Sequence, residues 1–290
     1  MAFPILRLLI FLCFFVNQSL SDPRATEAAL ICSNTTAAAS DRQIFVATFL
    51  AAMDSVTPLV SNRKYGSVVN GTGNTTVYAF GECMKDLSQT DCNLCFAQCK
   101  TQILRCLPFQ RLIRGGRLFY DGCYLRYDDY RFFNESTSAV DRTVCATSDF
   151  GGNQTLFRAN VVELVGNLSV EAPKNDGFFV GSVNRGNLTV YGLAQCWEFV
   201  NGSACENCLA NSVSRINSCL PKEEGRVLNA GCYMRYSTQR FYNNSESDTP
   251  AGNGGGSRLA IILAATSAAF AFVLIVVTVS FFTRKRVLKR

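Results

Sequence analysis

The alternation of apolar and polar positions in the first half of the chain predicts a helix followed by a hairpin. Ser40 stands where an N-cap residue is expected, and the apolar positions after it recur at helical spacing. The stretch 68–80 is rich in Thr, Val, Asn and Gly, as β-hairpins are. The apolar face of the predicted helix comprises Ile44, Phe45, Phe49, Leu50 and Met53.

A second helix and a further strand follow the hairpin. The helix is predicted from about Thr90 to Cys106, and Gly122 to Phe133 alternates and is aromatic, as strands are. One face of this helix carries Cys95, Cys99, Ile103 and Cys106. The helical pattern recurs in the second half of the chain at Leu156, Phe157, Val161, Leu164 and Val165. Helices with antiparallel strands in one small unit indicate an α+β fold.

The cysteines show that the chain contains an internal repeat. Gly122-Cys-Tyr-Leu-Arg-Tyr127 also recurs, as Gly231-Cys-Tyr-Met-Arg-Tyr236. We infer a tandem duplication, with a first repeat at 22–134 and a second at 135–244. Five cysteines recur 113 residues later and the sixth 109 later: Cys32, Cys83, Cys92, Cys95, Cys106 and Cys123 match Cys145, Cys196, Cys205, Cys208, Cys219 and Cys232.

Both ends of the chain differ from the repeats in composition. Residues 1–21 have the layout of a signal peptide, because their apolar run is too short to act as a membrane anchor, which needs ~20 residues. Residues 245–258 read as a flexible Gly/Ser stalk. Residues 259–282 carry no charge and predict one transmembrane helix, and 283–290 form a basic tail. This order predicts a single-pass type I protein with its repeats extracellular.

Charge and composition exclude several classes of function. Six of the 28 basic residues lie in the leader and the tail, which leaves 22 against 22 acidic residues outside the membrane. A neutral ectodomain argues against nucleic-acid binding. The sequence has no His, which removes the Ser-His-Asp and Cys-His catalytic arrangements and His-containing metal sites. We therefore expect no enzyme, no catalytic residues, no metal site and no cofactor.

The Cys-x-x-Cys pairs at Cys92 and Cys205 allow a zinc, a redox or a disulfide interpretation. Zinc would need four reduced cysteines in an oxidising compartment, so disulfides are favoured. Six cysteines per repeat allow 15 pairings, and spacing alone does not choose among them. Cys99 has no cysteine counterpart in the second repeat, where Ser212 stands at the equivalent position. It is interpreted either as a reactive thiol or as a buried, inert one. Trp197 is interpreted as a core residue.

The remaining polar residues give weaker signals. Asp121, Asp128, Asp129 and Glu135 could supply a carboxylate pair for glycoside hydrolysis, but solvated strand ends are the preferred interpretation. Alanines four apart within 259–282 are compatible with self-association of the span. Candidate N-glycosylation sites are Asn34, Asn70, Asn74, Asn134, Asn153, Asn167, Asn187, Asn201 and Asn243.

The spacing Cys83-x8-Cys92-x2-Cys95, found again at Cys196, resembles the plant ginkbilobin-like, or stress-antifungal, domain. The resemblance covers most of both repeats. It implies an antiparallel sheet of about five strands with two helices in each repeat. The disulfides that it implies are Cys32–Cys106, Cys83–Cys92, Cys95–Cys123, Cys145–Cys219, Cys196–Cys205 and Cys208–Cys232, with Cys99 unpaired.

The resemblance also implies a sugar site, because a single-domain antifungal member binds mannose. Its ligating positions correspond to Ser33, Arg117 and Asp128 in the first repeat. The second repeat has Ala146, Arg226 and Ser237 at those places, so only the arginine is kept in both. Loss of polar partners weakens such a site, and both arginines also read as surface charges.

Two such domains before one span resemble two plant families, the cysteine-rich receptor-like kinases and the plasmodesmata-located proteins. We expect a receptor-like ectodomain and span without the kinase, at the plasma membrane, in stress or defence signalling. Its expected partners are receptor-like kinases, a cell-wall glycan, or a second copy through the span. The alternatives are a plasmodesmal protein that regulates cell-to-cell traffic and a mannose-binding antifungal lectin.

Overall fold

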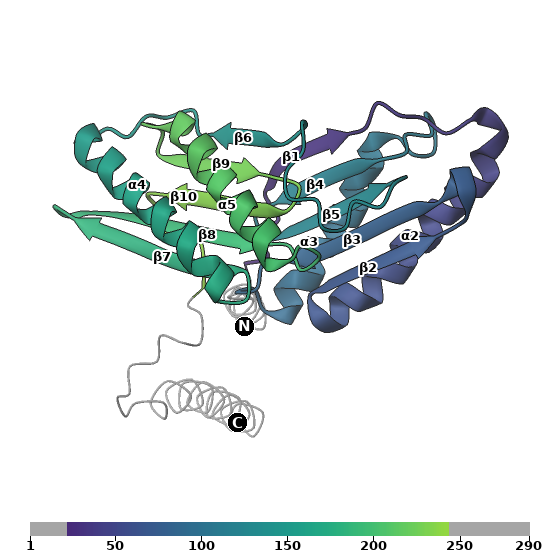
Figure 1. Ribbon diagram of the computed structural model, residues 1–290, viewed down its shortest axis with the longest axis horizontal. Coiled ribbons are helices and arrows are strands. Elements are labelled where there is room, and N and C mark those ends of the chain that lie inside the picture. The colour runs from purple at the N-terminus through teal and green to yellow at the C-terminus, as the bar shows by residue number, and fades with distance from the viewer. Residues whose placement is uncertain (1–21, 244–290) are drawn as a thin grey trace, which may run out of the picture. The chain divides into compact units, whose positions relative to one another are not determined.

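The computed structural model describes residues 22–243, in which each repeat forms one five-stranded antiparallel sheet with two helices (Figure 1). The predicted fold class is confirmed for both repeats. The predicted signal peptide, stalk, transmembrane helix and tail lie outside the described residues. The helices and strands of the first repeat are β1 (Glu27–Cys32), α2 (Arg42–Arg63), β2 (Tyr65–Asn70), β3 (Val77–Cys83), α3 (Gln89–Gln102), β4 (Gly116–Tyr120) and β5 (Cys123–Asp128).

The second repeat has the same order of elements and the same sheet topology. The first sheet runs β1-β4-β5-β3-β2 and the second runs β6-β9-β10-β8-β7, which are equivalent orders. In Figure 1, α4 and α5 lie across the second sheet. The elements of this repeat are β6 (Arg142–Cys145), α4 (Gln154–Glu171), β7 (Phe178–Arg185), β8 (Leu188–Cys196), α5 (Gly202–Ile216), β9 (Glu224–Leu228) and β10 (Cys232–Ser237).

The start of α2 differs from the prediction. Ser40 does not cap it, because residues 39–41 form a 3-10 turn and the Ser40 hydroxyl donates to the carboxylate of Asp41. Two apolar residues assigned to its buried face, Ile44 and Leu50, are 60% and 45% exposed. The other three residues predicted for this face, Phe45, Phe49 and Met53, are buried, and the face that packs on β2 and β3 also includes Ala52, Val56 and Val60.

The three other long helices begin at side-chain caps. The hydroxyl of Ser88 accepts a hydrogen bond from the N–H of Asp91 at the start of α3, at 3.1 Å. In the second repeat the caps are asparagines, Asn153 before α4 and Asn201 before α5. A cap of this kind satisfies a main-chain N–H that the helix itself leaves without a partner.

Helix α2 is also the one helix among the described residues that is long and apolar enough to cross a membrane by length and composition (Ala39–Arg63, with the preceding 3-10 turn). It contacts the sheet of the first repeat along β2 and β3, as the core helix of a globular domain does. Four of the five residues expected on one face of α4, Phe157, Val161, Leu164 and Val165, are buried, and the fifth, Leu156, is half-buried.

The predicted strand from Gly122 to Phe133 is shorter than expected. Strand β5 ends at Asp128, and the chain then folds back so that the Phe132 ring lies under the guanidinium of Arg126, with the ring centre 3.9 Å from the guanidinium carbon. The glycine before this strand is required by its surroundings, because a Cβ on Gly122 would lie 2.3 Å from the carbonyl oxygen of Pro23. A similarly crowded glycine, Gly231, precedes β10.

Candidate functional site at the junction of the two repeats

Aromatic side chains join the two repeats. The indole of Trp197, in the second repeat, stacks on the Tyr124 ring of the first, with centroids 4.6 Å apart and planes 10° apart. Phe199 meets Phe80 edge to face at 4.7 Å. Trp197 is 1% exposed and belongs to the hydrophobic core of the first repeat. The prediction that Trp197 is a core residue is confirmed, but the core it enters is that of the neighbouring repeat.

Beside the rings lies a buried polar cluster formed by both repeats. Oε1 of Glu82 accepts a hydrogen bond from Gln195 Nε2 at 2.8 Å, and its Oε2 accepts one from the main-chain N–H of Glu198 at 2.7 Å. Gln195 Oε1 accepts from the N–H of Lys85 at 2.9 Å. Glu82 is 1% exposed, and this burial raises the pKa of its carboxyl to about 8.

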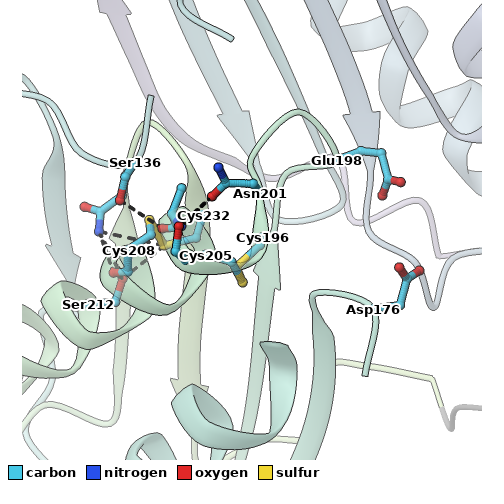
Figure 2. Close-up of a disulfide and its surroundings, with 12 residues drawn as sticks. Ser136, Asp176, Cys196, Glu198, Asn201, Cys205, Cys208, Ser212 and Cys232 are labelled. Atoms are coloured by element: carbon cyan, nitrogen blue, oxygen red, sulfur yellow. Dashed lines mark hydrogen bonds between the residues drawn. A yellow bond between two sulfur atoms is a disulfide. The ribbon is translucent and has the colours of Figure 1, made fainter. Parts of the chain in front are cut away.

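Lys85 extends this cluster toward the surface. Its Nζ lies 2.6 Å from the carboxylate of Asp176 and 3.4 Å from that of Glu198. Burial opposes the charge of Lys85, but the hydrogen bond to Asp176 and the two negative charges raise the pKa of its ammonium overall. Figure 2 shows the Asp176 and Glu198 side chains directed into the same region, where both reach Lys85.

A cleft lies next to these groups, beside the Cys196–Cys205 disulfide. Its volume is about 190 Å³, and it is lined in part by Asp176, Trp197 and Glu198 and by the first residues of α5. Within residues 22–243, no group of three or more Cys, Asp or Glu side chains is arranged to hold a metal ion. Asp176 and Glu198 are already paired with Lys85, so the described residues that line the cleft present no free pair of carboxylates for acid–base chemistry.

A pair of arginines on neighbouring strands marks the equivalent place in each sheet. Arg117 on β4 lies opposite Arg126 on β5, and Arg226 on β9 lies opposite Arg235 on β10. Three of these arginines are buried, and the side chain of Arg226 is 14% exposed, so their charges require carboxylate partners. The sequence suggested that Arg117 and Arg226 were surface charges, and the structure corrects this: both are inside ion-pair clusters.

Three carboxylates hold the first arginine pair. Arg126 donates to Glu135 at 2.5 Å and to Asp128 at 3.0 Å, while Arg117 lies 3.4 Å from Asp141. Glu135 and Asp141 come from the segment that connects the repeats. Burial raises the pKa of Asp128 and of Asp141, against the effect of the arginines. Asp128 and Glu135 are therefore not the solvated strand ends that the sequence suggested.

The second arginine pair takes its central carboxylate from the other repeat. Asp121, in the first repeat, receives two hydrogen bonds from Arg226, at 2.7 and 2.8 Å, and lies 3.2 Å from Arg235. The hydroxyl of Tyr233 donates a further bond to it at 2.9 Å. Burial would raise the pKa of Asp121, but the hydrogen bonds and charges of the arginines lower it. Asp121 thus fastens the first repeat to the second.

The structure brings two of the three predicted sugar-binding residues together. A Cβ placed on Gly115 would lie 2.5 Å from Asp128 Oδ1 and 3.2 Å from Ser33 Cβ, so both side chains flank this glycine. Ser33 hydrogen-bonds to Thr35 at 2.7 Å. Arg117 is directed instead at Glu135 and Asp141. In the second repeat, Arg226 is likewise held by a carboxylate, that of Asp121.

The disulfides in the structure are the six pairs that the resemblance implied: Cys32–Cys106, Cys83–Cys92, Cys95–Cys123, Cys145–Cys219, Cys196–Cys205 and Cys208–Cys232. Cys99 is free and buried, and its sulfur lies 3.5 Å from that of Cys123. Burial raises the pKa of the Cys99 thiol well above its usual value. Ser212 occupies the same place in the second repeat, with its hydroxyl oxygen 3.4 Å from the Cys232 sulfur. Figure 2 shows both residues.

Sequence reasoning missed the residues that join the repeats. Glu82 and Lys85 lie beside framework cysteine Cys83 in an ordinary polar stretch, and nothing local marks them as buried. A usable signal was the internal alignment, because Glu82 and Lys85 are equivalent to Gln195 and Glu198, 113 residues later. The alignment shows that these positions differ between repeats but not that they face each other.

Comparison with known proteins agrees with this architecture. The chain is 32% identical over 98% of its length to cysteine-rich receptor-like protein kinase 2 of Arabidopsis thaliana, and 27% identical over 76% to plasmodesmata-located protein 7 of the same plant, of which it covers 72%. The tandem DUF26 ectodomain of the Arabidopsis cysteine-rich receptor-like protein PDLP8 has the same fold, with a TM-score of 0.62 and 24% identity over 73% of this chain and 98% of that one.

The chain spans between 33% and 42% of the length of the receptor-kinase relatives it matches first. The family model described as salt stress response/antifungal matches residues 31–130 and 144–239, which is one match in each repeat. These two matches cover more than half of the chain and contain most of both sheets. The chain therefore belongs to the salt stress response/antifungal family and carries two of its domains in tandem.

Proposed function

We propose that this chain is a non-catalytic, receptor-like surface glycoprotein that acts by binding through its paired repeats in stress or defence signalling. The expected ligand is a cell-wall component or the ectodomain of a sister receptor. The kinship with receptor-like kinases supports this role, since the two family domains lie within the region that matches those relatives. We further propose that the protein sits in the plasma membrane with its repeats outside the cell.

The main support for the proposal is that the arginines at the family's sugar-binding position are bound by carboxylates of the protein itself. Arg117 and Arg226 are neutralised by Asp141, Glu135 and Asp121 inside the protein. A sugar would have to compete with these internal carboxylates for the guanidinium groups, and breaking a buried ion pair costs about 3–5 kcal/mol. The arginines therefore stabilise the contact between the repeats. In this proposal the ligand binds to the outer surface of the two joined repeats.

Binding can be tested with the full chain carrying an affinity tag after Arg290, co-expressed in plant cells with a panel of full-length receptor-like kinases. We expect at least one kinase to co-purify with the wild type. Trp197→Ala, which removes the aromatic contact between the repeats, should weaken this capture. Arg185→Glu, which alters only an exposed ion pair with Glu163, should not. Absence of any kinase from the wild-type sample would refute a sister receptor as the ligand and leave the cell-wall component.

A mannan-binding assay on the same purified chain tests the lectin alternative. We expect no retention by mannan, because Arg117 is occupied. Ser33→Ala and Asp128→Asn remove the other two predicted ligands, and a melting curve on each variant checks that the fold persists. Specific retention by mannan that both substitutions abolish would establish the lectin function in place of the one proposed.

The likeness to plasmodesmata-located proteins favours a second candidate, a role in cell-to-cell traffic. A fluorescent tag after Arg290 in plant epidermis, viewed beside a plasmodesmal marker, separates the two. A continuous outline of the cell supports the plasma-membrane receptor. Discrete dots that coincide with the marker would support the plasmodesmal alternative and would call for assays of dye movement between cells.

A further inference from the structure

The contacts between the repeats follow an approximate two-fold symmetry. Glu82 and Gln195 are equivalent positions, 113 residues apart, and their side chains hydrogen-bond to each other. Lys85 and Glu198 are also equivalent, and they form an ion pair at 3.4 Å. When two equivalent residues touch each other, the pseudo-symmetry axis must pass between them. The axis therefore passes close to both pairs.

The hydrogen bonds to the main chain obey the same symmetry. The carboxylate of Glu82 accepts from the N–H of Glu198 at 2.7 Å. The amide oxygen of Gln195 accepts from the N–H of Lys85 at 2.9 Å, which is the symmetry-related bond. Each repeat thus offers one side-chain acceptor and one main-chain donor to the other, as in the interface of a symmetric dimer.

The side chains that meet across this axis nevertheless differ between the repeats, while the framework around them is kept. Cys83 and Cys196 are the same residue in both repeats, as are Tyr124 and Tyr233. The equivalent residues that differ are Glu82 and Gln195, Met84 and Trp197, Lys85 and Glu198, and Asp86 and Phe199.

These differences are complementary. A pairing of two first repeats would place a glutamate against a glutamate at position 82 and a lysine against a lysine at position 85. A pairing of two second repeats would place Glu198 against its own copy. A pair of lysines or a pair of Glu198 carboxylates would place like charges at close range, which costs free energy, and two Glu82 carboxyls would lack the amide donor that Gln195 supplies. The observed pairing instead matches a carboxyl with an amide and an ammonium with a carboxylate.

We propose that Glu82 and Lys85, with Gln195 and Glu198, form a pairing code that makes a first repeat dock on a second repeat and not on another copy of itself. The residues act as specificity determinants for an interaction surface whose partner is the second repeat of the same chain. The code keeps first repeats of neighbouring copies from docking on each other, whatever ligand their outer surfaces bind.

The sequence supplies a direct reporter for the test, because Trp197 is its only tryptophan and lies in the contact between the repeats. Its fluorescence shifts to longer wavelength when the indole becomes exposed, so the thermal transition of that signal follows undocking of the repeats. The full chain, purified in detergent micelles, is compared as wild type, Lys85→Glu, Glu198→Lys and the double charge swap Lys85→Glu/Glu198→Lys.

Each single charge reversal places like charges across the axis and should lower the midpoint of the Trp197 transition by about 4–10 °C. The double swap should recover part of this loss, because the two exchanged charges again have opposite signs and attract each other, while the repulsion between a glutamate at position 85 and Asp176 keeps the recovery incomplete. The control Arg185→Glu reverses a charge in an exposed ion pair away from the axis and should leave the midpoint within about 1 °C.

A second variant addresses the symmetry itself. Glu82→Gln/Lys85→Glu makes both axis positions identical in the two repeats, so at pH 5, where the exchange of Glu82 for Gln is itself destabilising, it should dock worse than the double swap although it alters two residues as well. The proposal is overturned if the losses of the two single variants simply add in the double swap. It is equally overturned if the symmetric variant shows the wild-type midpoint.

Discussion

We expect the contact between the two repeats to depend on pH, because the carboxyl of Glu82 is buried in it. Its ordinary pKa is 4.5, and burial raises the folded-state pKa to about 8. The charged groups that face it are Glu198, which raises this pKa further, and Lys85, which lowers it. The stability contributed by the protonated carboxyl is therefore fully present below pH 4.5 and is lost as the pH rises through about 8, because the unfolded carboxyl ionises first.

The magnitude follows from the difference between the two pKa values. A shift of one unit corresponds to about 1.4 kcal/mol, so the whole effect is on the order of 5 kcal/mol. Between pH 5 and pH 8 the loss is about 3 kcal/mol, which lowers the melting temperature of a protein of this size by roughly 6–12 °C. The two repeats should thus be held together better at mildly acidic pH than at alkaline pH.

Glu82→Gln removes the titration while keeping the shape of the side chain. The amide has one acceptor oxygen where the carboxyl has two, so either Gln195 Nε2 or the N–H of Glu198 loses its partner, at about 1–3 kcal/mol. We expect the variant to be less stable than the wild type at pH 5 and more stable at pH 8. Melting followed by Trp197 fluorescence from pH 5 to 8 measures the crossing, with Glu163→Gln on α4 as the control. A difference between wild type and Glu82→Gln that stays constant across this range would refute the reasoning.

Three further predictions concern residues at the junction and the free thiol. Asp121→Ala removes one of the two carboxylates that Arg226 and Arg235 share, and it should lower the free energy of unfolding by about 3–5 kcal/mol in a denaturant titration. A loss under about 1 kcal/mol would show that Glu224 alone suffices. Trp197→Ala should lower the free energy of unfolding by about 3–5 kcal/mol in the same titration, whereas Val170→Ala, at an exposed position, should change it little. Equal effects of the two substitutions would contradict the role of the indole. Cys99→Ser should fold and keep the melting temperature of the wild type, because a serine, Ser212, occupies the equivalent place in the second repeat. The wild-type thiol should resist alkylation at pH 8 until the protein unfolds. Rapid labelling of the native protein would contradict the burial of Cys99.

The cysteine spacing allowed the repeats and their fold class to be predicted from the sequence, and the helical face of Cys99 indicated that this thiol is buried. The cysteine spacing can be read directly from the sequence, so the repeats are recognised without any knowledge of how the chain packs. Helical faces were predicted less well: Ile44 and Leu50 are as apolar as their neighbours, and only the path of the sheet beneath α2 decides which of them is covered.

The polar residues of the junction could not be predicted because their environment is created by the other repeat. Asp121 and Asp128 look like strand-end carboxylates in the sequence, and solvation is the ordinary state of such residues. Burial of Asp121 depends on Arg226, which lies 105 residues away. Trp197 was correctly expected to be buried, yet its stacking partner Tyr124 belongs to a different sheet. Interactions between domains leave no local periodicity to detect.

The asparagine caps of α4 and α5 have a consequence for the sugars that the protein could carry. The amide oxygens of Asn153 and Asn201 accept from the N–H groups of Leu156 and Ala204 at 3.0 and 2.8 Å. Both asparagines are also glycosylation sequons, and a glycan bonds to the amide nitrogen, leaving the oxygen free to cap. Glycans at these positions would be anchored to a helix end instead of a loop. The first sugar residues of these glycans would then point in a fixed direction from the surface of the second repeat.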